Sequence, residues 1–194
     1  MAKLYVIMGK SSTGKDTVYK RIVEKTDVTT ITMYTTRPMR AGEAQGREYF
    51  FIDEETLADL EKEDKIIELR AYNTVHGIWK YLTVDDGQIN PESEEKYLII
   101  ATLEAYEKYL AYYGKEVVVP IYIEVDDRTR IHRALQREDA EQNPKYKEMC
   151  RRFIADEEDF SEEKVQRAGI SRRFRNEDLT ICTAEITKYI KSLQ

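Results

Sequence analysis

Apolar residues along this chain gather in short runs, and amphipathic polar stretches separate the runs from one another. Four runs are rich in β-branched or aromatic residues: Leu4–Met8, Val28–Met33, Tyr97–Ala101 and Val117–Val125. Such runs favour buried β-strands. Helical patterns lie between them, over Val18–Lys25, Glu54–Glu63 and Leu103–Tyr113. Strands that alternate with helices predict an α/β fold whose parallel sheet carries helices on both faces.

The segment from Arg37 to Asp86 follows a different pattern. It is polar and rich in turns, and glycines at positions 42, 46 and 77 separate its short aromatic runs. We interpret it as a small mixed-β lobe that is inserted into the parallel domain. The predicted organisation is therefore a core over residues 1–36, an inserted lobe over 37–86, and a continuation of the core over 87–194.

Composition narrows the class of protein without identifying it. The 194 residues are 41% hydrophobic and 35% charged, which is typical of a folded globular domain. The net charge of −6 argues against a general nucleic-acid binder. No apolar stretch approaches the roughly 20 residues of a membrane span, and Cys150 and Cys182 lack metal-ligand spacing. We expect a cytoplasmic monomer or homodimer with no membrane or nucleic-acid partner.

A glycine-rich motif directly follows the first apolar run. It matches the phosphate-binding loop Gly-x-x-x-x-Gly-Lys, and its residues are Gly9, Lys10, Ser11, Ser12, Thr13, Gly14, Lys15, Asp16 and Thr17. In such a loop successive backbone N–H groups curl around a phosphate, and the following helix directs its positive dipole end at the same anion. Lys15 adds a mobile positive charge. An ordinary strand–turn–helix is the less favoured alternative.

The position after the lysine departs from this motif, because Asp16 replaces the usual Ser or Thr. That hydroxyl normally ligates Mg²⁺. The carboxylate of Asp16 is also a hard oxygen ligand, and a hydroxyl follows at Thr17. We expect Mg²⁺ at Asp16 or Thr17, although a carboxylate beside Lys15 could instead weaken phosphate binding.

A second motif extends from Thr35 to Phe51. Arg37 and Arg40 flank Pro38, and a glycine-bounded turn leads on to Tyr49. Arginine forms bidentate contacts with phosphate, and a tyrosine hydroxyl adds one donor. The chemistry fits a clamp for a monophosphate and, about equally well, a surface hairpin with scattered charges.

Arginines are concentrated in the C-terminal third of the chain. Arg133 and Arg137 are one helical turn apart and share a face, and Arg152 begins a new helical segment after the turn at 143–144. Most charge runs are solvated helix faces. The alternative is a cationic lid over a polyphosphate, at about residues 128–152.

The two motifs together resemble the guanylate kinase family. Residues 35–51 resemble its Thr-Thr-Arg-x-Pro-Arg-x-Gly-Glu-x-x-Gly-x-x-Tyr-x-Phe pattern with one change of spacing, and Arg133–Arg137, Arg152-Phe153 and Asn176–Leu179 resemble later family segments in the same order. The resemblance implies a P-loop NTPase-type parallel sheet flanked by helices, with a lobe that binds a nucleoside monophosphate and a helical lid. It implies transfer of a phosphoryl group from ATP, with Mg²⁺, to GMP or dGMP.

The resemblance also implies a role for individual residues. Lys15, Arg133, Arg137 and Arg152 would act on the transferred phosphate, and the loop from Gly9 to Thr17 with Asn176 would bind ATP. The acceptor site would comprise Arg37, Arg40, Glu43, Tyr49, Glu68, His76 and Thr102. Within this set, Glu68 resembles the glutamate that reads the guanine edge.

The departures from the family pattern fall mostly on the base pocket. Met33 takes the place of a serine, His76-Gly77-Ile78 replaces a Tyr-Gly-Ser/Thr stretch, and Ile100-Ala101-Thr102 replaces an Asp-x-Asp. Two alternatives therefore stay open beside a guanylate kinase. One is a kinase of the same fold that acts on another phosphorylated small molecule. The other is an inactive, phosphopeptide-binding relative of the fold.

Overall fold

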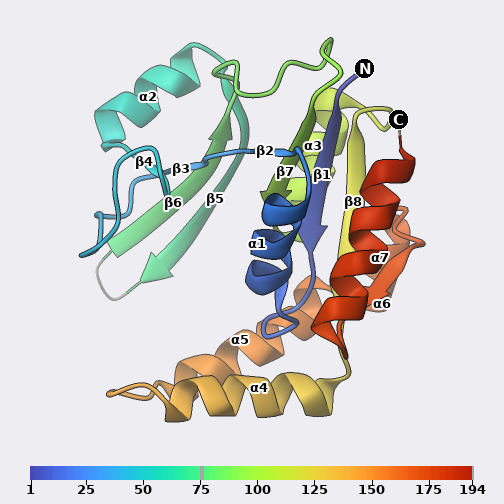
Figure 1. Cartoon of the computed structure of the whole chain (residues 1–194). Coiled ribbons are helices and arrows are strands. Elements are labelled where there is room, and N and C mark those ends of the chain that lie inside the picture. The colour runs from blue at the N-terminus through green and yellow to red at the C-terminus, as the bar shows by residue number, and fades with distance from the viewer. Residues whose placement is uncertain (75–76, 194) are drawn as a thin grey trace.

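A parallel sheet forms the core of the computed structural model, which describes residues 1–74 and 77–193 (Figure 1). Its five strands lie in the order β2-β7-β1-β8-β9, and each neighbouring pair is parallel. The strands are β1 (Lys3–Met8), β2 (Thr29–Thr30), β7 (Lys96–Ile100), β8 (Val118–Glu124) and β9 (Arg173–Arg175). This confirms the predicted α/β fold.

Helices cover both faces of this sheet, and a separate apolar cluster fills each side. On one face α1 (Lys15–Lys25) and α7 (Leu179–Ser192) bury Ile22 and Ile186 against Tyr5. On the other face α3 (Leu103–Tyr113) and α6 (Glu162–Arg167) bury Tyr109 and Val165 among residues of β1 and β7. Because both faces are buried, the strands have the continuous apolar runs that the sequence shows.

A second, mixed sheet forms the inserted lobe (Figure 1). It has the order β4-β3-β6-β5, and α2 (Glu54–Lys62) packs Leu57 with Leu82 and Val84. The strands are β3 (Tyr34–Thr35), β4 (Phe50–Phe51), β5 (Ile66–Thr74) and β6 (Gly77–Val84). The lobe thus contains the predicted short β-strands.

The predicted single strand over residues 28–33 is wrong. Only Thr29–Thr30 of this run form a strand, β2, which pairs with β7 in the parallel sheet; the strand β3 of the second sheet begins after the run, at Tyr34, and pairs with β6. Between them Thr32 pairs through its backbone with the side-chain amide of Gln88. The apolar run therefore marks the crossing from one sheet to the other rather than one continuous strand.

A helical hairpin extends beyond the carboxyl end of β1. It consists of α4 (Asp127–Asp139) and α5 (Tyr146–Asp159), and in Figure 1 it lies below the loop that joins β1 to α1. The second helix begins at Tyr146, so the expectation that it starts at Arg152 is wrong by more than one turn. Within the described residues no helix is long and apolar enough to cross a membrane.

Candidate nucleotide-binding site

The loop after β1 has the backbone conformation that its glycines allow. Gly9 has φ of 146°, and a Cβ there would lie 2.2 Å from the carbonyl oxygen of Ile123 in β8. Gly14 has φ of 88°, and a Cβ there would lie 2.5 Å from Nδ2 of Asn176. Ser12 is left-handed too, with φ of 63°. Side chains are therefore disfavoured at both glycines by φ and by close packing, against a backbone carbonyl at Gly9 and against the side-chain amide of Asn176 at Gly14.

Lys15 folds back over this loop from the first turn of α1. Its Nζ donates hydrogen bonds to the carbonyl oxygens of Gly9 at 2.6 Å and Lys10 at 2.9 Å. Burial lowers the pKa of Lys15, while the neighbouring carboxylates of Asp16 and Asp156 act in the opposite direction. The ammonium is therefore held at the mouth of the loop by two carbonyl oxygens that an anion could replace.

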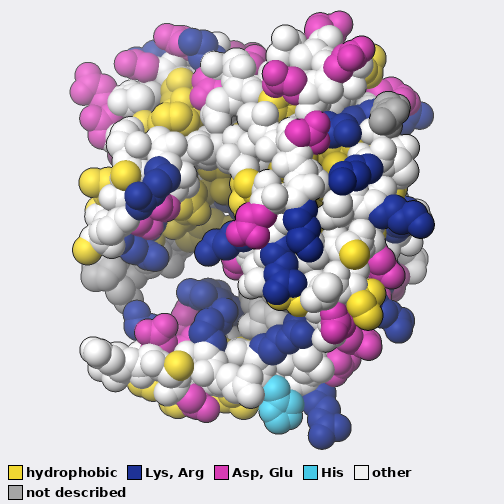
Figure 2. All heavy atoms as spheres, in the orientation of Figure 1, with side chains coloured by type: hydrophobic (Ala, Val, Ile, Leu, Met, Phe, Trp, Pro, Cys, Tyr) yellow, Lys and Arg dark blue, Asp and Glu magenta, His cyan; other side chains and the backbone are white. Residues whose placement is uncertain are grey.

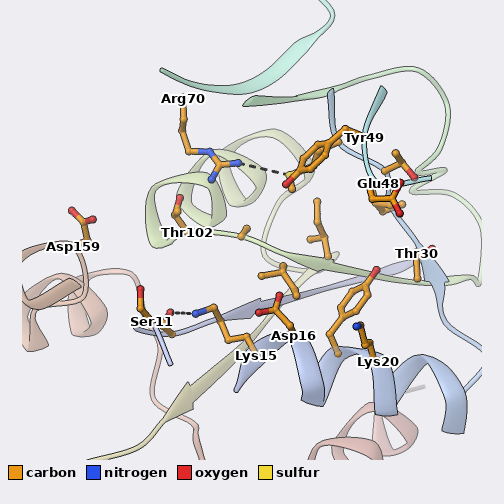
Figure 3. Close-up of a pocket in the computed structure, with 18 of the residues that line it drawn as sticks. Ser11, Lys15, Asp16, Lys20, Thr30, Glu48, Tyr49, Arg70, Thr102 and Asp159 are labelled. Carbon is orange, nitrogen blue, oxygen red and sulfur yellow. Dashed lines mark hydrogen bonds between the residues drawn. The ribbon is translucent and has the colours of Figure 1, made fainter. Parts of the chain in front are cut away.

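Asp16 and Thr17, the predicted Mg²⁺ ligands, are both exposed at the start of α1. Asp16 lines the cavity described below (Figure 3), whereas Thr17 is not among the described lining residues. The described residues contain no cluster of three or more acidic, His or Cys side chains that could hold a metal. One carboxylate fits the usual binding of Mg²⁺, which reaches such sites largely through substrate phosphates.

Asn176 closes the loop from the C-terminal side of the chain. Its Nδ2 donates to the carbonyl oxygen of Thr13 at 2.7 Å, and its own N–H donates to the carbonyl oxygen of Glu124 at 3.0 Å. The hydroxyl of Thr13 in turn donates to the carbonyl oxygen of Lys10 at 2.9 Å. Asn176 therefore supports the shape of the phosphate-binding loop.

A cavity of about 670 Å³ connects this loop to the inserted lobe. Figure 2 shows the molecule hollowed between the helical hairpin and the rest of the chain, with Lys and Arg side chains around the opening. In Figure 3, Lys15, Ser11 and Asp16 lie at one end of the cavity, and Tyr49 and Arg70 lie across from them. The cavity thus joins the predicted ATP site to part of the predicted acceptor site.

The predicted phosphate clamp is only partly in this cavity. The Arg37 guanidinium is bound by Glu43, with Nη2–Oε1 at 2.8 Å and Nη1–Oε2 at 3.0 Å. The backbone N–H of Arg40 also donates to Glu43, at 2.7 Å. Among the described residues, the cavity lining includes Tyr49 but not Arg37, Arg40 or Glu43. Glu43 therefore occupies the guanidinium of Arg37, which is itself only 3% exposed.

Thr102 was predicted to belong to the site of the acceptor substrate, and it lies on the side of the parallel sheet. It lines the cavity, and its hydroxyl accepts a hydrogen bond from the N–H of Ala105 at 3.2 Å, which caps α3. His76 lies outside the described residues. Glu48, which precedes Tyr49, lines the cavity as well and was not predicted.

Glu68, the predicted reader of guanine, is buried in an ion pair. Its carboxylate accepts from Nε of Arg70 at 2.8 Å and from the Thr83 hydroxyl at 3.0 Å. Burial would lower the pKa of Arg70, but Glu68 outweighs it and raises that pKa. Among the described residues Arg70, rather than Glu68, lines the cavity. Arg70 is a residue that the sequence analysis missed, although opposite charges two apart on a strand share a face.

The three predicted lid arginines do not come together. Nη2 of Arg133 donates to the carbonyl oxygen of Asn176 at 2.9 Å, beside the loop. Arg137 is 52% exposed, and its Nη2 lies 3.8 Å from Glu138. Arg152 is 57% exposed, and its Nε donates to Glu148 at 3.0 Å. Only Arg133 is held next to the phosphate-binding loop, and the other two face solvent.

A different arginine joins the hairpin to the loop. Arg130 is fully buried, and its Nε donates to the carbonyl oxygen of Ser11 at 3.1 Å. Its Nη2 donates at 3.0 Å to Asp156 of α5, which itself accepts from the N–H of Ser11 at 2.8 Å. The guanidinium also lies over the ring of Phe153, at 4.5 Å from the centroid. Arg130 was passed over because sequence spacing alone gives no reason to prefer it to Arg133.

A parallel sheet with a glycine-rich loop at the carboxyl end of β1, closed over by Lys15, is the arrangement of the P-loop class of folds. Within that class, residues 1–80 match the model of the guanylate kinase family. The predicted resemblance to the guanylate kinase family is thereby confirmed.

Individual relatives agree with this match. A guanylate kinase from Thermus thermophilus is 39% identical over 70 residues, which are 36% of this chain and 32% of the relative. One from Legionella pneumophila is 37% identical over 76 residues, 38% of this chain and 36% of the relative. The chain thus spans about a third of the length of the curated relatives it matches.

The fold comparison extends over the whole chain. The crystal structure of guanylate kinase from Anaplasma phagocytophilum superposes with a TM-score of 0.65 at 20% sequence identity, covering 100% of this chain and 86% of that one. At this identity the match shows the fold alone. The family-model match covers the loop and most of the inserted lobe, and the similarity of fold extends over the whole chain.

Proposed function

We propose that this protein transfers a phosphoryl group from ATP to a nucleoside monophosphate, with GMP or dGMP as acceptor. The observation that carries the proposal is the single cavity that joins the phosphate-binding loop to Tyr49 and Arg70 of the inserted lobe. Both substrates must meet for direct transfer, and this cavity offers them a shared space. The family model that matches residues 1–80 is that of guanylate kinase, and the curated relatives are named guanylate kinases, which supports the same reaction.

The loop and Lys15 would bind the donor. Backbone N–H groups of the loop would surround the β-phosphate, and the Lys15 ammonium would leave its two carbonyl partners for the phosphate oxygens. Mg²⁺, when bound with ATP, neutralises charge on the phosphates, and Asp16 would hold it from the first turn of α1. No covalent intermediate with the protein is required.

The inserted lobe would bind the acceptor. Tyr49 already lines the cavity and would donate its hydroxyl to the acceptor phosphate. Arg37 would exchange the Glu43 carboxylate for that phosphate, because both are anions of matching bidentate geometry. Arg40 is exposed on the same segment and would add a second cation.

The helical hairpin would close over both substrates. The side chains of Arg137 and Arg152 are 52% and 57% exposed, and each is held by an ion pair at the surface, so both are free to turn toward the transferred charge. Arg133 already lies next to the loop through the Asn176 carbonyl. Closure would exclude water and bring the arginines to the transition state, where they stabilise the developing charge.

The test is a coupled assay of ADP release with MgATP and a panel of GMP, dGMP, AMP, CMP, UMP, dTMP and sugar phosphates. We expect turnover with GMP and dGMP, and a loss of about 10²–10³ in kcat for Lys15→Ala. Lys25→Ala is the matched control, because Lys25 is exposed in the last turn of the same helix. Absence of both turnover and ATP binding would overturn the proposal and leave a phosphate-recognising module.

A further inference from the structure

Two opposite charges on β5 lie where the inserted lobe meets the cavity. Glu68 and Arg70 are two residues apart on the strand and lie on one face. The Glu68 side chain is only 1% exposed, and that of Arg70 is 11% exposed. The pair therefore lies at the boundary between the buried interior and the cavity, with the carboxylate on the interior side.

The protein itself satisfies the carboxylate of Glu68. One oxygen, Oε2, accepts from Nε of Arg70 at 2.8 Å. The other, Oε1, accepts from Nη2 of Arg70 at 3.2 Å, from the Thr83 hydroxyl at 3.0 Å and from the Tyr109 hydroxyl at 3.4 Å. A ligand could reach this carboxylate only by displacing a buried arginine, which would leave an uncompensated charge behind.

The guanidinium of Arg70 retains N–H groups that are available to donate hydrogen bonds to a ligand. A guanidinium has five N–H groups, and in the described part of the chain Nε and Nη2 bond to Glu68, with Nη2 also 3.7 Å from the sulfur of Met33. Nη1 makes no hydrogen bond to any residue in the part of the chain that the structure describes. Figure 3 shows the guanidinium of Arg70 beside Tyr49, at the end of the cavity opposite Lys15.

We infer that Arg70 reads the base of the acceptor, and that Glu68 is a positioning residue that fixes the guanidinium. The inference rests on the proposed function and deepens it. A guanidinium only donates, so the base edge that it faces must present hydrogen-bond acceptors. Guanine does so with O6 and N7, the edge that arginine binds in a bidentate manner, whereas adenine places an N6 amino donor there.

The substrate class that follows is that of the 6-oxopurine nucleoside monophosphates. Hypoxanthine has the same O6 and N7 as guanine and lacks only the 2-amino group. A carboxylate in this position would accept from both N1–H and the 2-amino group of guanine, and it would lose the second of these hydrogen bonds with hypoxanthine, which keeps only N1–H. An arginine that binds O6 and N7 makes no contact that depends on the 2-amino group. Discrimination between GMP and IMP therefore separates the two modes of recognition.

The experiment measures kcat/KM of the wild-type protein for GMP, IMP and AMP at saturating MgATP. We expect GMP and IMP to agree within about fivefold and AMP to be lower by about 10² or more, since its amino group leaves donors facing each other. A value for IMP about 10² below GMP would overturn the inference while leaving the proposed kinase intact. Turnover of none of the three would overturn the proposed function and this inference with it.

Substitution of Arg70 tests whether this side chain causes the preference for GMP and IMP over AMP. Arg70→Met should raise KM for GMP and IMP by a similar factor of about 10–200, reduce the preference for GMP over AMP, and leave KM for ATP unchanged. Arg70→Lys should restore part of the preference. Lys80→Met on the neighbouring strand β6 is the control, because its Nζ pairs with Glu54 and it is not among the described lining residues. An unchanged ratio of GMP to AMP in a folded Arg70→Met protein would contradict the assignment.

Discussion

Arg130 offers a quantitative test of how the helical hairpin is attached to the phosphate-binding loop. Its guanidinium is fully buried and contacts three carboxylates, on Asp127 at 2.7 Å, Asp156 at 3.0 Å and Glu157 at 3.0 Å. Replacing Arg130 by Met keeps an unbranched apolar side chain over the ring of Phe153 and removes the charge. We expect this substitution to lower the free energy of unfolding.

The magnitude follows from the burial of the three partners. Removing one member of a buried ion pair costs about 3–5 kcal/mol. Asp127 and Glu157 are 58% and 44% exposed, so water solvates them when Arg130 is gone, and their share is small. Asp156 is 12% exposed and keeps two contacts with Ser11. The expected loss is therefore about 3 kcal/mol, at the lower end of the range.

A double-mutant cycle with Asp156→Asn isolates the pair itself. Asp156→Asn alone should cost about 1–2 kcal/mol, because Arg130 keeps two carboxylates. The double variant should lose less than the sum of the single losses, with a coupling energy of about 1–2 kcal/mol. Arg128→Met is the matched control on the same helix, since Arg128 is exposed, and it should change stability by no more than about 0.5 kcal/mol.

The assay is urea unfolding at pH 7, followed by circular dichroism and by the fluorescence of Trp79, with coincident transitions as the criterion for two-state analysis. A loss below about 1 kcal/mol for Arg130→Met would show that the buried contacts carry little stability. Strict additivity in the cycle would show that Arg130 and Asp156 are not energetically coupled. Either result would refute the reasoning.

Two further predictions concern the loop and the thiols. Gly9→Ala should lower the free energy of unfolding by about 3 kcal/mol or more in a urea titration, because its Cβ would meet the Ile123 carbonyl. Gly42→Ala is the control: Gly42 has φ of 86° and a Cβ there would meet no atom within 4 Å, so the loss should be only about 1 kcal/mol. Equal losses for the two variants would contradict the packing argument. Burial raises the pKa of Cys182 to about 11, whereas Cys150 is exposed. A disulfide reagent at pH 8 should therefore label one thiol rapidly in the native protein and two after unfolding, with Cys150→Ser removing the rapid phase. Equal rates for both thiols in the native protein would refute it.

The sequence by itself determined the features that depend on short spacing. The phosphate-binding loop from Gly9 to Thr17, the alternation of strands and helices, and the mixed-β lobe all follow from patterns a few residues long, because backbone conformation and the burial of one face respond to near neighbours. The chemistry of the second motif suggested Tyr49, and the family resemblance suggested Thr102; both line the cavity.

Only the tertiary structure decided which charged side chains are partnered and which are available. Asp156 meets Ser11 across 145 positions of the chain, and this contact selects Arg130 over the exposed Arg137 and Arg152. In the same way, Thr83 and Tyr109 fix Glu68 in the interior, so Arg70 is the charge that faces the cavity. The physical reason is that a buried charge is stable only where its partners converge, and partners that lie far apart in sequence leave no local pattern to read.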